Sequence, residues 1–205
     1  MDNLEKYEIT SDPYQTFETW FQKALTLEEN PHAMALATST KDGVPTVRTV
    51  LFKGIKEQDG VKYFSFVTNY ESRKGQDISE NPHVALSFYW HKSERQVSLR
   101  GIATKMKQED SKIYFHSRAK ESQAASAISR QSSVVSDRDE LVKKYNECLE
   151  RFADQDVIDY PENWGGYLIE VSTIEFFVYG EFRLNDRFEF SKANDSSWQI
   201  KRLSP

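Results

Sequence analysis

The segment from Thr68 to Gly75 combines several features of an anion-binding site. A strand is expected to end there and a helix to begin, and the first helical turn carries Arg73 and Lys74. Backbone N–H groups and the helix dipole favour a bound anion at such a helix start, and the two cations would neutralise a phosphate. The alternative interpretation is an ordinary solvated surface, on which adjacent Arg and Lys residues are common.

Three polar residues repeat at intervals of four: Tyr114, Arg118 and Ser122. On one helical stretch this spacing places a phenol, a guanidinium and a hydroxyl on the same face, which predicts a second phosphate site. A helix surface with unrelated polar residues would show the same spacing, so the pattern alone leaves both interpretations open.

Two charged residues lie in the otherwise mostly apolar strand Arg48–Lys53. Alternation places Arg48 on the same face as Val50 and Phe52, and Lys53 on the opposite face. Charges inside such a strand cost free energy unless they are paired or meet a ligand. An edge strand with outward-facing charges is the alternative.

The turn Arg183–Arg187 holds two guanidiniums, an amide and a carboxylate just before a strand. Asp186 could pair with one arginine as a structural contact. Alternatively, one arginine is left to bind a ligand anion. Together with the other basic segments, this turn suggests an aromatic-rich barrel with two anion sites.

Several common kinds of site are missing from the sequence. No Gly-x-Gly-x-x-Gly follows a strand, and no Gly-Lys-Ser/Thr phosphate loop is present. The four histidines are scattered without a spacing that suits a metal, so no metal site is expected. Cys148 falls on the apolar stripe of a helix, where we expect it to be buried and inert.

Composition limits the class of protein. The 205 residues are 13% aromatic, and they predict a single domain over residues 1–205. The net charge of −5 arises entirely within residues 137–162, which hold nine acidic and four basic side chains. The rest of the chain is neutral, so no nucleic-acid partner is expected. No apolar run could span a membrane, no secretory signal is recognisable, and a lone cysteine favours a reducing, cytoplasmic location.

The first half of the chain predicts a helix followed by an antiparallel meander. Asp12 and Pro13 begin the helix, and Asn30-Pro31 ends it. A short helix is expected over Glu71–Asn81. Strands are expected over Ala33–Ser39, Thr46–Lys53, Val61–Thr68, Val84–Trp90 and Gln96–Met106. Consecutive hairpins with one helical crossing favour a barrel.

The second half predicts helices and then more strands. Gln108–Ser132 is typical of short helices, and Ser136 is expected to begin a longer helix with an apolar stripe that ends at Phe152. An acidic loop over Asp154–Asn163 follows. Strands are expected over Tyr167–Val171, Ile174–Tyr179, Arg187–Phe190 and Trp198–Arg202, so residues 167–205 would add strands to the same domain, whereas residues 1–11 would form a flexible arm.

An ordered set of motifs runs from about Asp12 to the last residue. It comprises Arg48–Lys53, Thr68–Gly75, Asn81-Pro82, Glu94–Val97, Tyr114–Arg118, Ser129–Ser132, Trp164–Gly166, Ile174–Phe176, Arg183–Arg187 and Arg202–Pro205. Each motif is weak alone, but in this order the set resembles the pyridoxine/pyridoxamine 5′-phosphate oxidase family.

The resemblance implies a mainly β protein with helices (α+β): an antiparallel, Greek-key-like, six-stranded split barrel with flanking helices. It also implies a homodimer with one FMN in each of two clefts at the subunit interface. By similarity, the FMN contacts would be Arg48, Thr49, Val50, Leu51, Val67, Thr68, Arg73, Lys74, Gln96, Gln131, Ser132, Phe177 and Arg187. The substrate phosphate would be held by Lys53, Tyr114, Arg118 and Ser122, and the catalytic pair Arg183 and Asn185 would lie against the pyridine ring.

The implied reaction is the oxidation of pyridoxamine or pyridoxine 5′-phosphate to pyridoxal 5′-phosphate. A hydride would pass from C4′ to flavin N5, and O₂ would reoxidise FMN and release H₂O₂. Asn185 and Phe177 stand where the family usually has His and Trp, and the start of the chain lacks the family's basic arm. The alternatives are a related flavin oxidase acting on another ring, such as a phenazine precursor, and a noncatalytic protein that binds FMN or pyridoxal phosphate.

Overall fold

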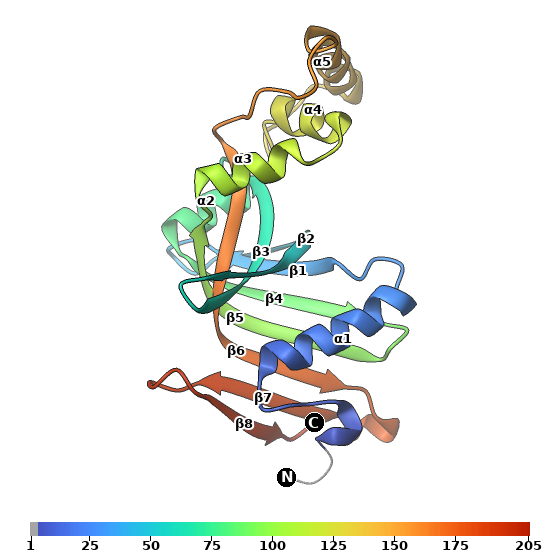
Figure 1. Ribbon diagram of the computed structural model, residues 1–205, viewed down its shortest axis with the longest axis vertical. Helices are drawn as coiled ribbons and strands as arrows, with labels where there is room; N and C mark the ends of the chain where they lie inside the picture. Colours follow the sequence, from blue (N-terminus) through green and yellow to red (C-terminus); the bar gives the residue numbers. More distant parts are fainter. Residues whose placement is uncertain (1–3) are drawn as a thin grey trace.

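Eight antiparallel strands form one sheet in the computed structural model, which describes residues 4–205 (Figure 1). In order of pairing they are β3 (Val61–Asn69), β2 (Pro45–Gln58), β1 (Ala33–Ser39), β4 (His83–Trp90), β5 (Arg95–Lys105), β6 (Trp164–Val178), β7 (Asp186–Lys192) and β8 (Trp198–Leu203). β3 also pairs with β6, which closes the first six strands into a barrel, while β7 and β8 extend the sheet. The expected six-stranded barrel is confirmed.

Five α-helices flank the strands within residues 4–205: α1 (Pro13–Leu27), α2 (Arg73–Glu80), α3 (Gln108–His116), α4 (Lys120–Ile128) and α5 (Arg138–Arg151). The group α3, α4 and α5 lies at the end of the molecule opposite β7 and β8 (Figure 1). In the part of the chain described, none of these helices is both long and apolar enough to cross a membrane.

Helix α1 forms as its sequence predicts and fills the barrel with aromatic side chains. The Asp12 side chain accepts a hydrogen bond from the backbone N–H of Tyr14, and Pro13 occupies the first helical position. Phe17 is fully buried, and its ring lies 4.7 Å from Phe64 in an edge-to-face arrangement. These contacts anchor the barrel strands that carry the candidate site.

The last strand of the barrel differs from its prediction. The two strands expected over Tyr167–Val171 and Ile174–Tyr179 are one continuous strand, β6. Its pairing with β5 shifts between Arg100 and Gly101, so Ser172 forms a bulge instead of a break. β6 stays continuous because β5 pairs with it along most of its length, whereas β3 pairs with its first half and β7 with its second.

Helix α5 begins one residue later than predicted and is less buried. Asp137 caps it by accepting a hydrogen bond from the N–H of Glu140, and Ser136 instead donates to the Glu140 carboxylate. No residue within α5 is fully buried; Phe152, just past its end, is buried in a small core, and Tyr145, Cys148 and Leu149 of α5 pack against that core while partly exposed. Cys148 is therefore half-buried, which corrects the expectation of full burial. Partial burial still raises the pKa of its thiol, so the thiol stays protonated near neutral pH.

The segment expected to be a flexible arm packs against the barrel from residue 4 onwards, while residues 1–3 lie outside the described part. Ile9 is buried, and Glu8 pairs with Lys23 and Arg95. The Tyr7 hydroxyl donates a hydrogen bond to Asp186 at the start of β7. These contacts connect the beginning of the chain to the far end of the sheet.

Candidate active site

A cavity of about 600 Å³ lies between the β2 and β3 strands, the start of α2, helix α3 and the loop after α4. It brings together most of the predicted site residues, namely Arg48, Thr49, Val50, Leu51, Lys53, Val67, Thr68, Arg73, Lys74, Tyr114, Arg118, Gln131 and Ser132. The other lining residues are Asn69, Ala125, Ser126, Ser129 and Trp164. The lining thus contains five cations and no carboxylate, which suits an anionic ligand. A larger hollow of about 800 Å³ over the outer face of the sheet contains none of the predicted residues.

Lys74 is the most unusual cation of this cavity because it is 93% buried (7% exposed). Its Nζ donates to Gln131 Oε1 at 2.8 Å and to the hydroxyls of Thr68 and Ser72 at 3.2 Å, all of which are neutral. Within residues 4–205 no carboxylate pairs with it. Burial, followed by the charge of Arg48, lowers the pKa of Lys74 to about 8. A buried ammonium without a counter-ion is what a phosphate dianion would satisfy.

The start of α2 places backbone donors beside Lys74. Ser72 caps the helix by accepting a hydrogen bond from the N–H of Gly75. A side chain at Gly75 would collide with the Tyr70 carbonyl, since a Cβ there would lie 2.0 Å from that oxygen. The N–H of Arg73 donates to the Ser132 hydroxyl at 3.2 Å, so the loop after α4 covers this helix start. We call Arg48, Arg73 and Lys74 the α2 cations.

Arg118 and Lys53 form a second cationic group, here called the α3 pair. The guanidinium of Arg118 lies 4.9 Å from the centre of the Trp164 ring, and its Nη1 donates to the Ser126 hydroxyl at 3.0 Å. Trp164 stacks parallel to Tyr114, whose ring centre lies 5.9 Å from Lys53 Nζ. Lys53 and Arg118 therefore face the same cavity.

The single helical face predicted for Tyr114, Arg118 and Ser122 is wrong, because the chain breaks between α3 and α4 at Arg118. Helix α3 ends at His116, and in the link to α4 the side-chain amide of Gln123 donates to the carbonyl of Arg118 at 2.8 Å. The Ser122 side chain does not line the cavity; its carbonyl instead accepts a hydrogen bond from Arg118 Nη2 at 2.7 Å. Ser126, one helical turn further along α4, does line the cavity, and its hydroxyl accepts a hydrogen bond from Arg118 Nη1.

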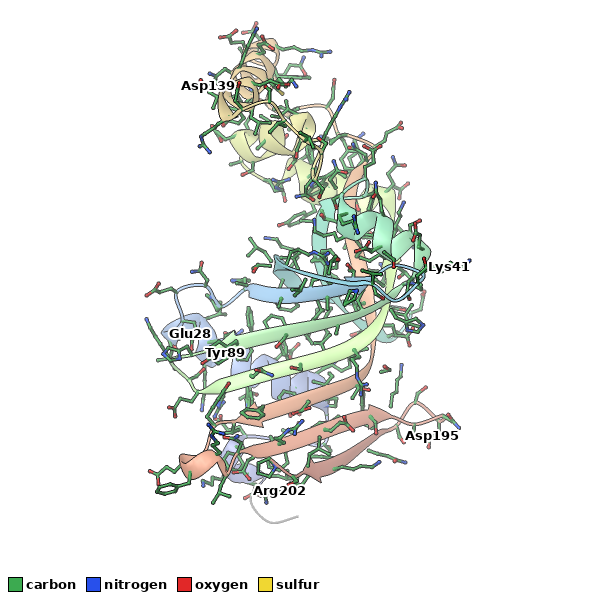
Figure 2. The ribbon with its side chains drawn as sticks, turned by 180° about the vertical axis from the view of Figure 1, so that it is seen from behind. Glu28, Lys41, Tyr89, Asp139, Asp195 and Arg202 are labelled. Carbon is green, nitrogen blue, oxygen red and sulfur yellow. The ribbon has the colours of Figure 1, made fainter. Side chains whose placement is uncertain are left out.

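The remaining predicted residues lie elsewhere. Gln96 and Phe177 are paired opposite each other on β5 and β6, Arg187 is on β7, and Arg183 and Asn185 are in the loop between β6 and β7. Figure 2 labels Asp139 on α5 and Arg202 on β8, and these two residues lie at opposite ends of the molecule. Neither Arg183 nor Asn185 lines the cavity, so a single chain does not bring these two residues to it.

One of the two alternatives for the turn Arg183–Arg187, in which Asp186 pairs with an arginine of the same turn, does not occur. Asp186 pairs with Arg202 of β8 and accepts the hydroxyl of Tyr7, not either arginine of its own turn. Arg187 pairs with Glu175 through Nε and Nη2, at 2.7 and 3.1 Å. Neighbouring strands supply these partners because side chains that face across a sheet are closer than those along a turn.

Sequence reasoning did not assign Trp164, Ser126 and Asn69 to the site. Trp164 and Asn69 lie within two of the family motifs, Trp164–Gly166 and Thr68–Gly75, so the sequence does contain a signal for both residues. Asn69 is buried, and its amide donates to the Ser129 carbonyl at 2.9 Å, which fixes the loop that carries Gln131. Ser126 had no signal, because its role depends on the break between α3 and α4.

Comparisons with known proteins agree with this geometry. Residues 21–152 match the family model described as pyridoxamine 5′-phosphate oxidase, and residues 164–205 match the pyridoxine 5′-phosphate oxidase C-terminal dimerisation region. The pyridoxine/pyridoxamine 5′-phosphate oxidase of Deinococcus deserti is 45% identical over 98% of this chain and 93% of its own. The one from Idiomarina loihiensis is 42% identical over 100% of this chain and 95% of its own.

Solved structures share the fold. PhzG from Burkholderia lata, in complex with tetrahydrophenazine-1-carboxylic acid, has a TM-score of 0.88 and 25% identity, and covers 100% of this chain and 98% of its own. A pyridoxamine 5′-phosphate oxidase-related, FMN-binding protein from Nostoc punctiforme has a TM-score of 0.74 at 14% identity, over 95% of this chain and 98% of its own. The barrel and its cationic cavity define a split-barrel protein. The chain belongs to the pyridoxamine 5′-phosphate oxidase family, and its C-terminal match supports a homodimer.

Proposed function

We propose that this protein oxidises pyridoxamine 5′-phosphate and pyridoxine 5′-phosphate to pyridoxal 5′-phosphate, with FMN as cofactor and O₂ as electron acceptor, releasing H₂O₂. The observation that carries the proposal is one cavity lined by two separate cationic groups, the α2 cations and the α3 pair. Two phosphomonoesters, one on the cofactor and one on the substrate, account for both groups. The names of relatives over 40% identical across almost the whole chain support the same reaction.

The residues present fit FMN at the α2 cations. Lys74 is a buried ammonium that lacks a counter-charge within the described residues, and it lies in the first turn of α2, where the helix dipole favours an anion. Arg48 and Arg73 would complete the phosphate contacts. Gln131 and Ser132, in the loop after α4, would line the other side of the FMN site. When bound, FMN supplies the two-electron acceptor that no side chain can replace.

The α3 pair would hold the substrate phosphate. Arg118 is fixed by Ser122, Ser126 and Trp164, so it presents its remaining donors to the cavity with little loss of side-chain entropy. Binding energy from the phosphate, which is remote from the reacting carbon, would orient the ring. The cavity residues thus bind and align the substrate rather than supply the oxidant.

Anaerobic reduction tests this function directly. We expect the purified protein to be yellow and to bleach when pyridoxamine 5′-phosphate or pyridoxine 5′-phosphate is added without O₂, as followed by the visible flavin absorbance. Readmitted O₂ should restore the colour with release of H₂O₂. A yellow protein that neither compound bleaches would contradict the oxidase function and favour a noncatalytic FMN-binding protein.

The similarity to PhzG supports a second candidate, the oxidation of a phenazine precursor. The ligand named for that structure carries a carboxylate and no phosphate, so the α3 pair would have less to bind. Bleaching by tetrahydrophenazine-1-carboxylic acid, but not by the phosphorylated compounds, would favour this candidate.

We infer further that each site is shared between two subunits. Arg183 and Asn185 lie far from the cavity of their own chain, in a loop whose Phe182 and Leu184 are 91% and 71% exposed. Apolar side chains this exposed are typical of a surface that a partner covers. A second copy that places this loop against the cavity would complete the site.

Subunit complementation checks the shared site. Arg118→Ala and Arg183→Ala should each impair turnover, whereas subunits of the two variants mixed after dissociation should regain activity. Random pairing makes half of the dimers mixed, with one intact site each, so about a quarter of the wild-type sites return. Mixed samples with no more activity than the average of the two variants would place both arginines in the site of one chain.

A further inference from the structure

A buried carboxylate lies directly behind the α2 cations. Asp77 is 2% exposed and sits one helical turn after Arg73 on α2. It does not line the cavity. The Thr38 and Thr46 hydroxyls donate to its Oδ2 at 2.6 and 2.7 Å. Burial would raise the pKa of Asp77, but these two hydroxyls and then Arg73 and Arg48 lower it below the usual range, so the carboxylate is ionised.

This carboxylate contacts two of the three α2 cations. Its Oδ1 lies 3.3 Å from Arg73 Nε, and its Oδ2 lies 3.7 Å from Arg48 Nη2. Arg48 is further fixed through Nη1, which donates to the Leu36 carbonyl at 3.1 Å and to the Thr38 hydroxyl at 2.7 Å. Asp77 and its threonines therefore set the orientation of both guanidiniums from the side away from the cavity.

Two physical effects of Asp77 on a bound anion oppose each other. Its negative charge repels a phosphate, and on this ground alone its removal should tighten binding. Its contacts hold Arg48 and Arg73 in place, and on this ground its removal should weaken binding, because mobile arginines lose side-chain entropy when they bind. The buried position and the four contacts favour the second effect.

We propose that Asp77 is a positioning residue for the FMN phosphate, which holds Arg48 and Arg73 ready to bind it. This inference rests on the proposed function, since it takes the ligand of the α2 cations to be FMN. It assigns a role to a residue that never touches the ligand. It also separates the α2 cations into two that depend on a carboxylate and one, Lys74, that does not.

The test is FMN binding to the apoprotein, measured by quenching of flavin fluorescence. Asp77→Asn keeps the shape of the side chain and removes its charge, and we expect the Kd for FMN to rise at least about tenfold. The Kd for riboflavin, which lacks the phosphate, should stay unchanged. Glu80→Gln, an exposed carboxylate change on the same helix, is the matched control and should alter neither value.

The outcomes separate this inference from the function itself. Tighter or equal FMN binding by Asp77→Asn overturns the positioning role. An equal loss of affinity for FMN and for riboflavin also overturns it, because Asp77 would then support only the general stability of the protein. If Asp77→Asn does not fold, Thr46→Val removes one contact to the same carboxylate, and its FMN Kd should rise with that of riboflavin constant; no rise overturns the role. Wild-type apoprotein that binds no FMN would overturn the proposed function together with this inference.

Discussion

Replacing Lys74 by Met is expected to weaken FMN binding by about 10- to 150-fold, the equivalent of about 1.5–3 kcal/mol for one hydrogen-bonded charge. The methionine fills a similar volume but removes an ammonium that is buried among neutral acceptors. Fluorescence titration of the apoprotein measures the change, and Lys41→Met in an exposed turn is the control. Unchanged affinity would show that the phosphate does not bind at the α2 cations.

The same lysine should make FMN binding depend on pH. The pKa of Lys74 is about 8 without a ligand, and a phosphate dianion beside it would raise that pKa. Near pH 7 the ammonium is already present and the phosphate, whose second pKa is about 6, is mostly a dianion, so affinity is nearly flat there. Above pH 8 binding requires proton uptake, and the Kd for FMN should rise by up to about tenfold per pH unit. Riboflavin, or the Lys74→Met variant, should lack this slope.

The Lys74 contribution to the stability of the apoprotein should increase as pH rises, whereas the affinity for FMN decreases. The pKa of about 8 in the folded protein is below the usual pKa of 10.5 for a lysine in an unfolded chain. Between these values the unfolded chain holds more protons, so the Lys74 contribution to the free energy of unfolding rises with pH across this window. Comparing urea unfolding of wild type and Lys74→Met isolates that contribution, and parallel pH profiles would contradict the low pKa.

Replacing Arg118 by Ala should raise the KM for pyridoxamine 5′-phosphate by about 10- to 150-fold while FMN stays bound. The reason is that Arg118 belongs to the α3 pair and is held by Ser122, Ser126 and Trp164 rather than by the α2 cations, so only one of the two phosphates loses a partner. Steady-state kinetics give KM, and the visible absorbance gives the FMN content.

Two comparisons make the Arg118 result specific. The KM for pyridoxamine, which has no phosphate, should hardly change in Arg118→Ala. Lys112→Ala, an exposed change on α3, should leave the kinetics as in wild type. Loss of FMN from Arg118→Ala would mean that the two phosphate sites are exchanged, with the cofactor at the α3 pair and the substrate at the α2 cations.

Some features of this protein are determined by short stretches of sequence. Asp12 and Pro13 begin α1 because a side-chain cap and a residue without an N–H suit a helix start wherever that helix packs. The strand β1 follows from its alternating apolar residues, and its predicted bounds, Ala33–Ser39, are those observed. The basic residues at the start of α2 likewise predict a phosphate site from local sequence alone, and this stays a prediction.

Other features depend on contacts between distant segments. The pairing of β3 with β6 brings Trp164 against Tyr114 and Arg118, and no local pattern specifies that pairing. The link between α3, which ends at His116, and α4 likewise contains a contact from further along the chain, the side-chain amide of Gln123 on the carbonyl of Arg118.

The sequence by itself determined the barrel class, most strand positions and the residue types that could bind two phosphates. Only the tertiary structure decided which of them share a cavity, that Asp77 lies behind Arg48 and Arg73, and that Arg183 lies away from the cavity of its own chain. The reason is that periodicity and capping act over a few residues, whereas a site is defined by pairs that are far apart in sequence and meet only when the barrel closes.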